Sequence, residues 1–166
     1  MTHHKADPRG YNTIMPYLII ENAASAIDFY KKIFGAKEVL CMKMPGNKIA
    51  HAELKVGDSV FMLADEYPDM GAFGPKHTKG SPVKLSIYVD DVDAVTKQAV
   101  AAGAKLVRPV QDQFWGDRSG MIEDPFGHMW GIATCKEVVS HDEMRKRFEN
   151  MMNQHQHKHH GKEGCC

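Results

Sequence analysis

The sequence predicts an α+β fold built from two similar modules, each with a strand, a helix and three further strands. Two observations support a repeat: amphipathic helical segments occur twice, and the same Gly-Ala-Lys triplet follows each of them. A third is that β-rich segments flank both helices. We therefore expect eight strands and two packed helices, followed by a further helix near the C-terminus.

The first module begins with a β-rich segment at 13–20 and a helix at 22–34, whose apolar positions 26, 27, 30, 33 and 34 share one face. Gly35-Ala36-Lys37 should end this helix, because glycine adopts the left-handed conformation common after helices. Strands are expected at 37–43, 49–56 and 59–64, and Gly57-Asp58 provides a tight turn between the last two.

The second module repeats this order. A strand at 83–89 precedes a helix at 91–102, which Asp90 or Asp91 can cap and Gly103-Ala104-Lys105 should end. Strands are expected at 105–109, 118–123 and 128–134, with the turn Asp124-Pro125-Phe126-Gly127 before the last. The modules thus span about 11–66 and 82–137 within a single domain at 11–139.

The remaining segments have distinct compositions. Residues 65–81 are rich in Gly, Pro and charge and predict a long loop that could cover a pocket. Ser140 and Glu143 form a capping-box pattern for a helix at 140–153, which we expect to pack on the domain or on a second copy. We expect flexibility at 1–10 and disorder in the His/Cys-rich tail at 154–166, which either binds metal or has no function.

Composition excludes several classes of protein. With 166 residues, 43% apolar and 25% charged, the chain fits one folded domain. Its 21 basic and 21 acidic residues create no field that favours nucleic acid or an anionic membrane surface. No apolar stretch approaches the ~20 residues of a membrane helix, and the polar start is unlike a signal peptide, so we expect a cytoplasmic protein with reduced cysteines.

Three ordered motifs identify a family. Pro16-Tyr17-Leu18 leads into Ala26-Ile27-Asp28-Phe29-Tyr30, and the segments 88–93 (YVDDVD) and 124–128 (DPFGH) follow. Together they resemble the glyoxalase/bleomycin-resistance (vicinal oxygen chelate) superfamily, and the stretches 51–53, 114–118 and 124–134 resemble its PhnB-like subgroup. This resemblance implies a curved mixed sheet of eight strands with helices on the convex face, a concave face that lines a small-molecule cavity, and a homodimer.

The resemblance also locates the metal site of metal-dependent members. Its four ligand positions fall on Met15, Met62, Lys84 and Gly131, and the two equivalent pairs are each 69 residues apart. Two thioethers, an ammonium group and a hydrogen atom do not suit a divalent ion, which prefers carboxylate, carbonyl or imidazole ligands. We therefore predict no metal and no cofactor.

Strand alternation indicates what the cavity contains instead. Lys84 and Tyr88 should point into it, and Lys84 would either pair with Glu53, await an anionic ligand, or lie at the rim of the sheet. His51 and Glu53 could act as a base and its orienting group, or lie on a solvated strand face. The candidate ligand-binding residues are Met15, Tyr17, His51, Glu53, Met62, Lys84, Tyr88, Trp115, Arg118 and Gly131.

Trp115 and Arg118 allow two interpretations. An indole and a guanidinium could grip a planar or anionic ligand, whereas an Asp117–Arg118 pair could simply lock a hairpin. The functional hypothesis is a metal-independent small-molecule-binding protein whose ligand can be anionic. The alternatives are a metal-dependent enzyme that uses His51, Glu53 or His128, and a regulatory or interaction protein with a vestigial cavity.

Overall fold

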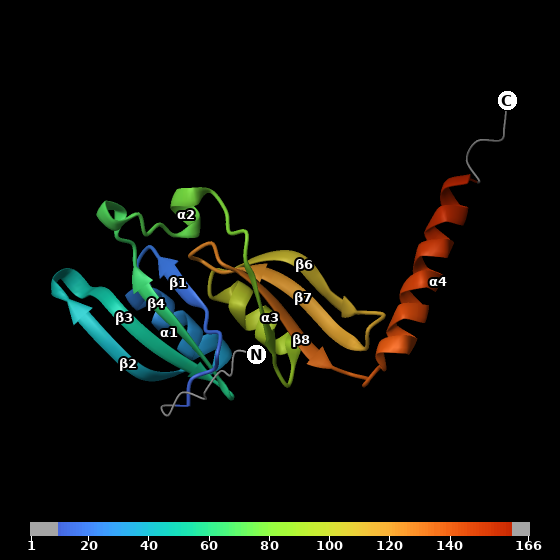
Figure 1. Cartoon of the computed structure of the whole chain (residues 1–166), viewed down its shortest axis with the longest axis horizontal. Helices are drawn as coiled ribbons and strands as arrows, with labels where there is room; N and C mark the ends of the chain where they lie inside the picture. Colours follow the sequence, from blue (N-terminus) through green and yellow to red (C-terminus); the bar gives the residue numbers. More distant parts are fainter. Residues whose placement is uncertain (1–9, 161–166) are drawn as a thin grey trace, which may run out of the picture.

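The computed structural model describes residues 10–160, and side chains as far as residue 154. The first module is a four-stranded sheet with one helix (Figure 1). Its strands follow the order β1-β4-β3-β2, in which only the β1–β4 pair is parallel. The elements are β1 (Tyr17–Ile20), α1 (Ala23–Phe34), β2 (Lys37–Met44), the 3-10 turn Pro45–Asn47, β3 (Lys48–Val56) and β4 (Ser59–Asp65).

The second module repeats this arrangement in the order β5-β8-β7-β6, with β5 and β8 parallel. Its elements are β5 (Lys84–Tyr88), α3 (Val92–Ala101), β6 (Lys105–Asp112), β7 (Asp117–Glu123) and β8 (Met129–Cys135). The predicted two-module α+β fold with eight strands is confirmed. The strands are hydrogen-bonded as two four-stranded sheets, so that β1 and β5 each form a free edge.

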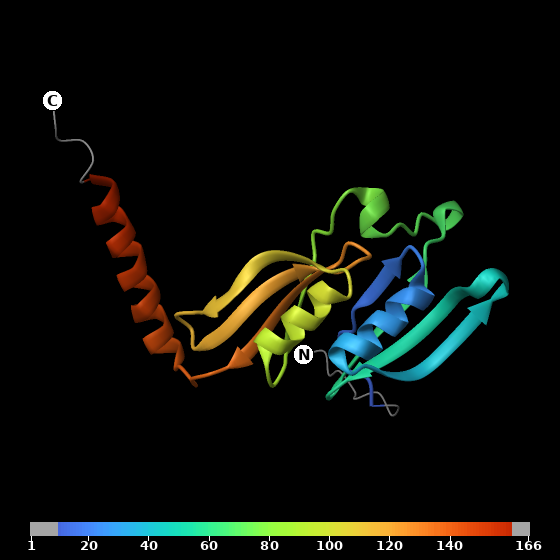
Figure 2. The same ribbon diagram turned by 180° about the vertical axis from the view of Figure 1, so that it is seen from behind.

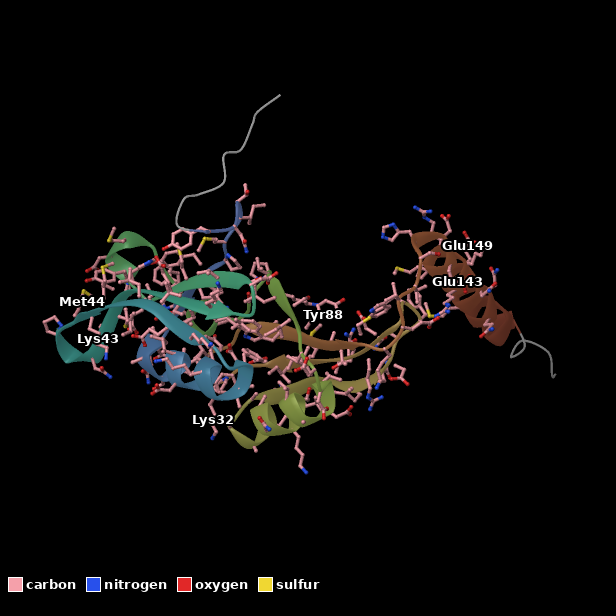
Figure 3. The ribbon with its side chains drawn as sticks, turned by 90° about the horizontal axis from the view of Figure 1, so that it is seen from below. Lys32, Lys43, Met44, Tyr88, Glu143 and Glu149 are labelled. Carbon is pink, nitrogen blue, oxygen red and sulfur yellow. The ribbon has the colours of Figure 1, made fainter. Side chains whose placement is uncertain are left out.

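Both helices lie on the same side of the two sheets. Figure 2 shows α1 and α3 side by side in front of their strands, and Figure 3 shows them together below the sheets. We call the side of each sheet that faces away from its helix the open face. Because successive side chains on a strand alternate between faces, odd-numbered residues of β7 and β8 belong to the open face and even-numbered ones pack toward α3.

Capping residues set the boundaries of both helices. The Asn22 side chain accepts the Ser25 N–H at the start of α1, and Gly35, with φ of 63°, ends that helix. In the second module Asp91, the second of the two candidates, accepts the Ala94 N–H. Asp65 supports the first module further, because its carboxylate accepts the N–H groups of Asn22, Ala23 and Ile49.

An aromatic core joins the modules. Tyr30 on α1 is fully buried, and its ring contacts rings from both halves of the chain. Alternate residues of the strands pack toward the helices. The buried ones include Leu18, Ile20, Ala52, Leu54, Phe61, Leu63, Trp130 and Ile132, and Val56, Leu85, Ile87 and Val89 are partly buried against the same core. These strands therefore keep the period of two that alternation assumes.

The loop between the modules contains two short helical turns, Pro68–Met70 and α2 (Pro75–Thr78). It packs on the second module, since a Cβ atom on Gly127 would lie 2.9 Å from the Cβ of Pro75. It also lines a groove of about 410 Å³ beside β1, in agreement with the expected position over a pocket.

Helix α4 (His141–His160) extends beyond residue 153, the end expected from the sequence, and projects away from the domain in Figure 1. Ser140 accepts the Glu143 N–H, as the capping pattern predicted. The helix contacts the domain where Phe148 meets Phe114 and where Arg147 pairs with Glu137. None of the described helices combines the length and hydropathy that a membrane span requires. The expectations for residues 1–9 and 161–166 lie outside the described residues.

Candidate functional site

The open face of the first sheet brings four of the predicted site residues together. Tyr17 on β1 lies opposite Met62 on β4, and Met62 lies opposite Glu53 on β3. His51 is two residues before Glu53 on the same strand and therefore shares its face. These four side chains form a continuous row across three strands.

A chain of hydrogen bonds connects the polar members of this row. The Tyr17 hydroxyl lies 2.9 Å from His51 Nδ1, and His51 Nε2 lies 3.2 Å from Glu53 Oε1. The hydroxyl of Tyr11, which precedes β1, donates to the other Glu53 oxygen. Glu53 is only 4% exposed, so a buried carboxylate orients an imidazole that contacts a phenol.

Tyr17 and Glu53 contact different ring nitrogens of His51, so the imidazole bridges the phenol and the carboxylate. Burial raises the pKa of Tyr17, so its hydroxyl keeps its proton at neutral pH.

The residues at the positions that the resemblance assigned to a metal do not fit a divalent ion. Strand register places Met62 opposite Tyr17 and Gly131 opposite Ser86, not opposite Met15 and Lys84. Met15 precedes β1, and Lys84 lies opposite Met129. The Met62 thioether and the Gly131 hydrogen atom form a poor donor set with Met15 and Lys84, and also with Tyr17 and Ser86. Within the described residues, no three His, Cys, Asp or Glu side chains gather as ligands.

The second sheet carries a separate polar cluster. Asp117, 8% exposed at the start of β7, accepts the Tyr88 hydroxyl at 2.8 Å and the Trp115 indole N–H at 3.0 Å. The hydrogen bond to Asp117 raises the pKa of Tyr88. Tyr88, labelled in Figure 3, is 66% exposed and lies on the side of the sheets away from the helices. Two predicted site residues are thus joined through a carboxylate.

Arg118 faces the opposite side of the same strand. Its guanidinium donates to both carboxylate oxygens of Asp93 on α3, at 2.7 and 2.8 Å, and to Asp112 at 3.1 Å. These hydrogen bonds from Arg118 lower the pKa of Asp93. We therefore correct the placement of Arg118 in the ligand site, because alternation turns it toward α3, where it fastens the helix to β6 and β7.

Lys84 is exposed, and Glu53 pairs with His51 in the other sheet. Lys84 instead borders a groove of about 450 Å³ with Lys76 and Lys79. Of the three positions anticipated for it, the rim of the sheet matches its exposure.

Two apolar grooves follow the free edges of β1 and β5. One, of about 500 Å³, lies between the modules and is lined by side chains that include Ile14, Pro16, Phe61, Ile87 and Tyr88. The other, of about 410 Å³, includes Tyr17, Ile19, Phe73 and His128. His128 Nε2 lies 3.2 Å from the Ile19 carbonyl, so this histidine links the modules instead of joining His51 and Glu53.

Sequence reasoning missed the partner residues of both clusters. Tyr11 lies before the first strand, where no periodicity indicates its direction. Asp117 was recognised next to Trp115, but not as the acceptor for Tyr88, which is 29 residues away in the chain. Parallel pairing of β5 with β8 and antiparallel pairing of β8 with β7 bring these residues together, and local patterns do not specify that proximity.

The fold and these motifs can be compared with known proteins. A family model described as the Glyoxalase/Bleomycin resistance protein/Dioxygenase superfamily matches residues 10–132. The chain belongs to this superfamily. The recognition made from the three sequence motifs is confirmed.

Several relatives of this superfamily member are similar over most of the chain. The uncharacterized protein Rv0887c of Mycobacterium tuberculosis is 40% identical over 135 residues, which cover 80% of this chain and 79% of the relative. The structure of PA1353 from Pseudomonas aeruginosa is 26% identical, covers 76% of this chain and 99% of its own, and has a TM-score of 0.62. A PhnB protein structure from Bacillus cereus shares the fold, with 19% identity, coverage of 75% and 100%, and a TM-score of 0.61.

Proposed function

We propose that this superfamily member binds a small, partly apolar molecule on its open sheet faces, without a metal ion as the binding group. The observation that supports this proposal is the Tyr17–His51–Glu53 chain of hydrogen bonds on the open face of the first sheet. It offers a hydroxyl and an imidazole on rigid strands, and rigid polar groups fix the orientation of a ligand.

The surroundings of this chain support the proposal. A carboxylate as buried as Glu53 is costly unless hydrogen bonds compensate it, and the bonds from His51 and Tyr11 provide that compensation. Met62 beside it is adaptable in shape, and the grooves along β1 add apolar surface. The site therefore combines a few fixed polar groups with apolar walls, which is typical of small-molecule sites.

We further propose that the chain acts as a homodimer in which a second copy encloses the open faces. Both β1 and β5 have a free edge, and Ile14, Tyr17, Val83 and Tyr88 leave large apolar side chains exposed near these edges. Exposed apolar patches of this kind favour protein association. Sedimentation velocity tests this: a dimer is expected, and a monomer at micromolar concentration would contradict it.

A thermal-shift screen of small aromatic and anionic compounds, with chelator present, tests the binding proposal. Compounds that bind the folded state raise its melting temperature. We expect the shift to vanish in His51→Asn and Glu53→Gln, and to persist in His141→Asn, a matched variant on exposed α4. Failure to find any stabilising compound, or equal shifts in all variants, would overturn the proposal.

Acid–base catalysis is a second candidate function that the same chain favours. His51 could take the Tyr17 proton at Nδ1, so that the Tyr17 oxygen removes a proton from a bound carbon acid while Glu53 orients the ring. Reversal of both transfers then returns a solvent deuteron to the carbon and restores the phenol and the imidazole. Deuterium exchange at carbon acids among the compounds found by the screen tests this. Exchange accelerated by the wild type and lost in Tyr17→Phe is expected; exchange that Tyr17→Phe retains contradicts the role.

A further inference from the structure

We propose that the open face of the second sheet carries an anion-binding site formed by Arg108 on β6 and Ser119 on β7. The site takes a carboxylate or phosphate group of a small molecule. This inference rests on the proposed function only in assuming that the anionic group belongs to the proposed small-molecule ligand. A free anion should bind at the same site. Neither residue belonged to the set predicted from the sequence.

Strand register places the two side chains on one face. Arg108 lies opposite Met121, and Ser119 is two residues before Met121 on β7. Ile122 is buried in the core, so its neighbour Met121 and also Ser119 point to the open face. Arg108 and Ser119 are diagonal neighbours, roughly 7–8 Å apart at their backbones, and an arginine side chain spans that distance.

A β-bulge in β6 explains why the sequence did not predict that Arg108 points to the open face. The register shifts between Arg108 and Gln111, and Val110 packs against the core. In a regular strand, Arg108 and Val110 would both point toward the helix, because they are two residues apart. A bulge inserts one residue between them, so Arg108 points to the opposite face from Val110. The irregular strand thus aims a cation at the open face.

Both groups have hydrogen-bonding capacity that the described residues leave unused. Ser119 is 5% exposed, and neither its hydroxyl nor the Arg108 Nε has a partner among them. Buried polar groups without partners are rare in folded proteins, and an anion that accepts from both donors would satisfy them. The other described arginines, Arg118, Arg145 and Arg147, each pair with a carboxylate.

No neighbouring acid compensates Arg108 within the described part of the chain. Asp117 shares the open face but accepts the Tyr88 and Trp115 donors. Glu123, two residues beyond Met121, forms no ion pair with Arg108 among the described contacts. A guanidinium whose Nε lacks a partner is well suited to carboxylate and phosphate oxygens.

Small residues of β8 lie beside the two donors. Gly131 lies opposite Met121, and Ala133 lies opposite Ser119. A Cβ atom on Gly131 would meet the Ser86 hydroxyl at 3.5 Å, an ordinary contact, so a side chain there would not clash. Glu53 lies opposite Met62 in the first sheet, and Met121 lies opposite Gly131 at the equivalent place in the second. Met121 therefore stands where the first sheet has the buried carboxylate of Glu53.

Titration of the full chain with inorganic phosphate and with acetate, at constant ionic strength, tests the site by ¹H–¹⁵N NMR. We expect saturable shifts of the Arg108 Nε–H and the Ser119 amide. Arg108→Gln should weaken binding about tenfold or more, because it removes the charge-assisted hydrogen bonds, and Ser119→Ala should weaken it severalfold. Arg145→Gln on exposed α4 is the matched control and should bind as the wild type does.

The outcomes separate the proposals. A stronger response to phosphate or to acetate assigns the anionic group, and equal responses support the shared chemistry. Shifts that do not saturate, or saturable binding that survives in Arg108→Gln, overturn the site. If Arg108→Gln does not fold, Arg108→Lys retains charge without the Nε donor and should still bind more weakly. If phosphate binds but the compound screen finds no stabilising compound, only the proposed function is rejected. If the screen finds such a compound but neither phosphate nor acetate binds, only the anion site is rejected.

Discussion

The hydroxyl of Tyr30 on α1 donates a 2.7 Å hydrogen bond to Asp124 in the turn between β7 and β8. Asp124 also accepts the Trp130 indole N–H at 2.9 Å and the backbone N–H groups of Phe126 and His128. One buried carboxylate therefore satisfies donors from both modules. The two sheets are held together by this network as well as by the aromatic rings around it.

Tyr30→Phe should lower the free energy of unfolding by about 1–3 kcal/mol, because a buried charged acceptor loses one donor while the ring keeps its packing. Urea titration followed by circular dichroism measures this. Tyr67→Phe is the matched control, since the Tyr67 hydroxyl reaches only the Met44 sulfur at the exposed surface. Equal losses in the two variants would contradict the importance of the Asp124 network.

The stability difference between wild type and Tyr30→Phe should depend on pH. Burial, together with Asp124, raises the pKa of Tyr30 well above the 10.0 of the unfolded chain. Above pH 10.0 the unfolded tyrosine loses its proton while the folded one retains it, so the contribution of Tyr30 is complete below that pH and declines above it. Urea titrations from pH 8 upward should show the gap narrowing by at most about 1.4 kcal/mol per pH unit. A constant gap contradicts the burial of a protonated hydroxyl.

Asp65→Ala should destabilise the protein by at least about 2 kcal/mol. The substitution removes a helix cap and leaves the N–H groups of Asn22, Ala23 and Ile49 without their acceptor. Thermal unfolding monitored at 222 nm is a suitable measurement. Asp58→Ala, in the exposed turn between β3 and β4, provides the comparison and should change little. A loss no larger than that of Asp58→Ala would refute the bridging role.

Arg118→Gln should leave phosphate binding unchanged, in contrast to Arg108→Gln, because the Arg118 guanidinium lies with Asp93 and Asp112 toward α3. The NMR titration that tests Arg108 serves here too, with folding verified by thermal unfolding. Loss of phosphate binding in a folded Arg118→Gln protein would contradict this prediction and would indicate that Arg118 contributes to ligand binding.

Local patterns predicted the modules because each signal was carried by neighbours in the chain. The apolar spacing of α1, its Gly35 stop and the Asp91 cap of α3 depend on residues within one or two turns. Alternation then assigned the buried faces, since regular strands preserve a period of two.

The same reasoning failed where contacts are long-range or a strand is irregular. Arg118 reaches Asp93 across 25 residues, and Tyr11 reaches Glu53 across 42. Arg108 changed face because of the bulge before Gln111, and no residue type in that segment marks a bulge. Helix α4 extends beyond its predicted end at residue 153. The prediction stopped there because the residues that follow are polar and interrupt the apolar spacing, but they do not break the helix.

Calorimetric titration of the strongest stabilising compound, in chelator, into wild type, His51→Asn and His141→Asn tests the central claim most directly. We predict saturable binding to the wild type and to His141→Asn, and at least a tenfold weaker affinity for His51→Asn, since that variant breaks the link between Tyr17 and Glu53. Binding that chelator abolishes, or that His51→Asn retains in full, would contradict a metal-independent site on the open face of the first sheet.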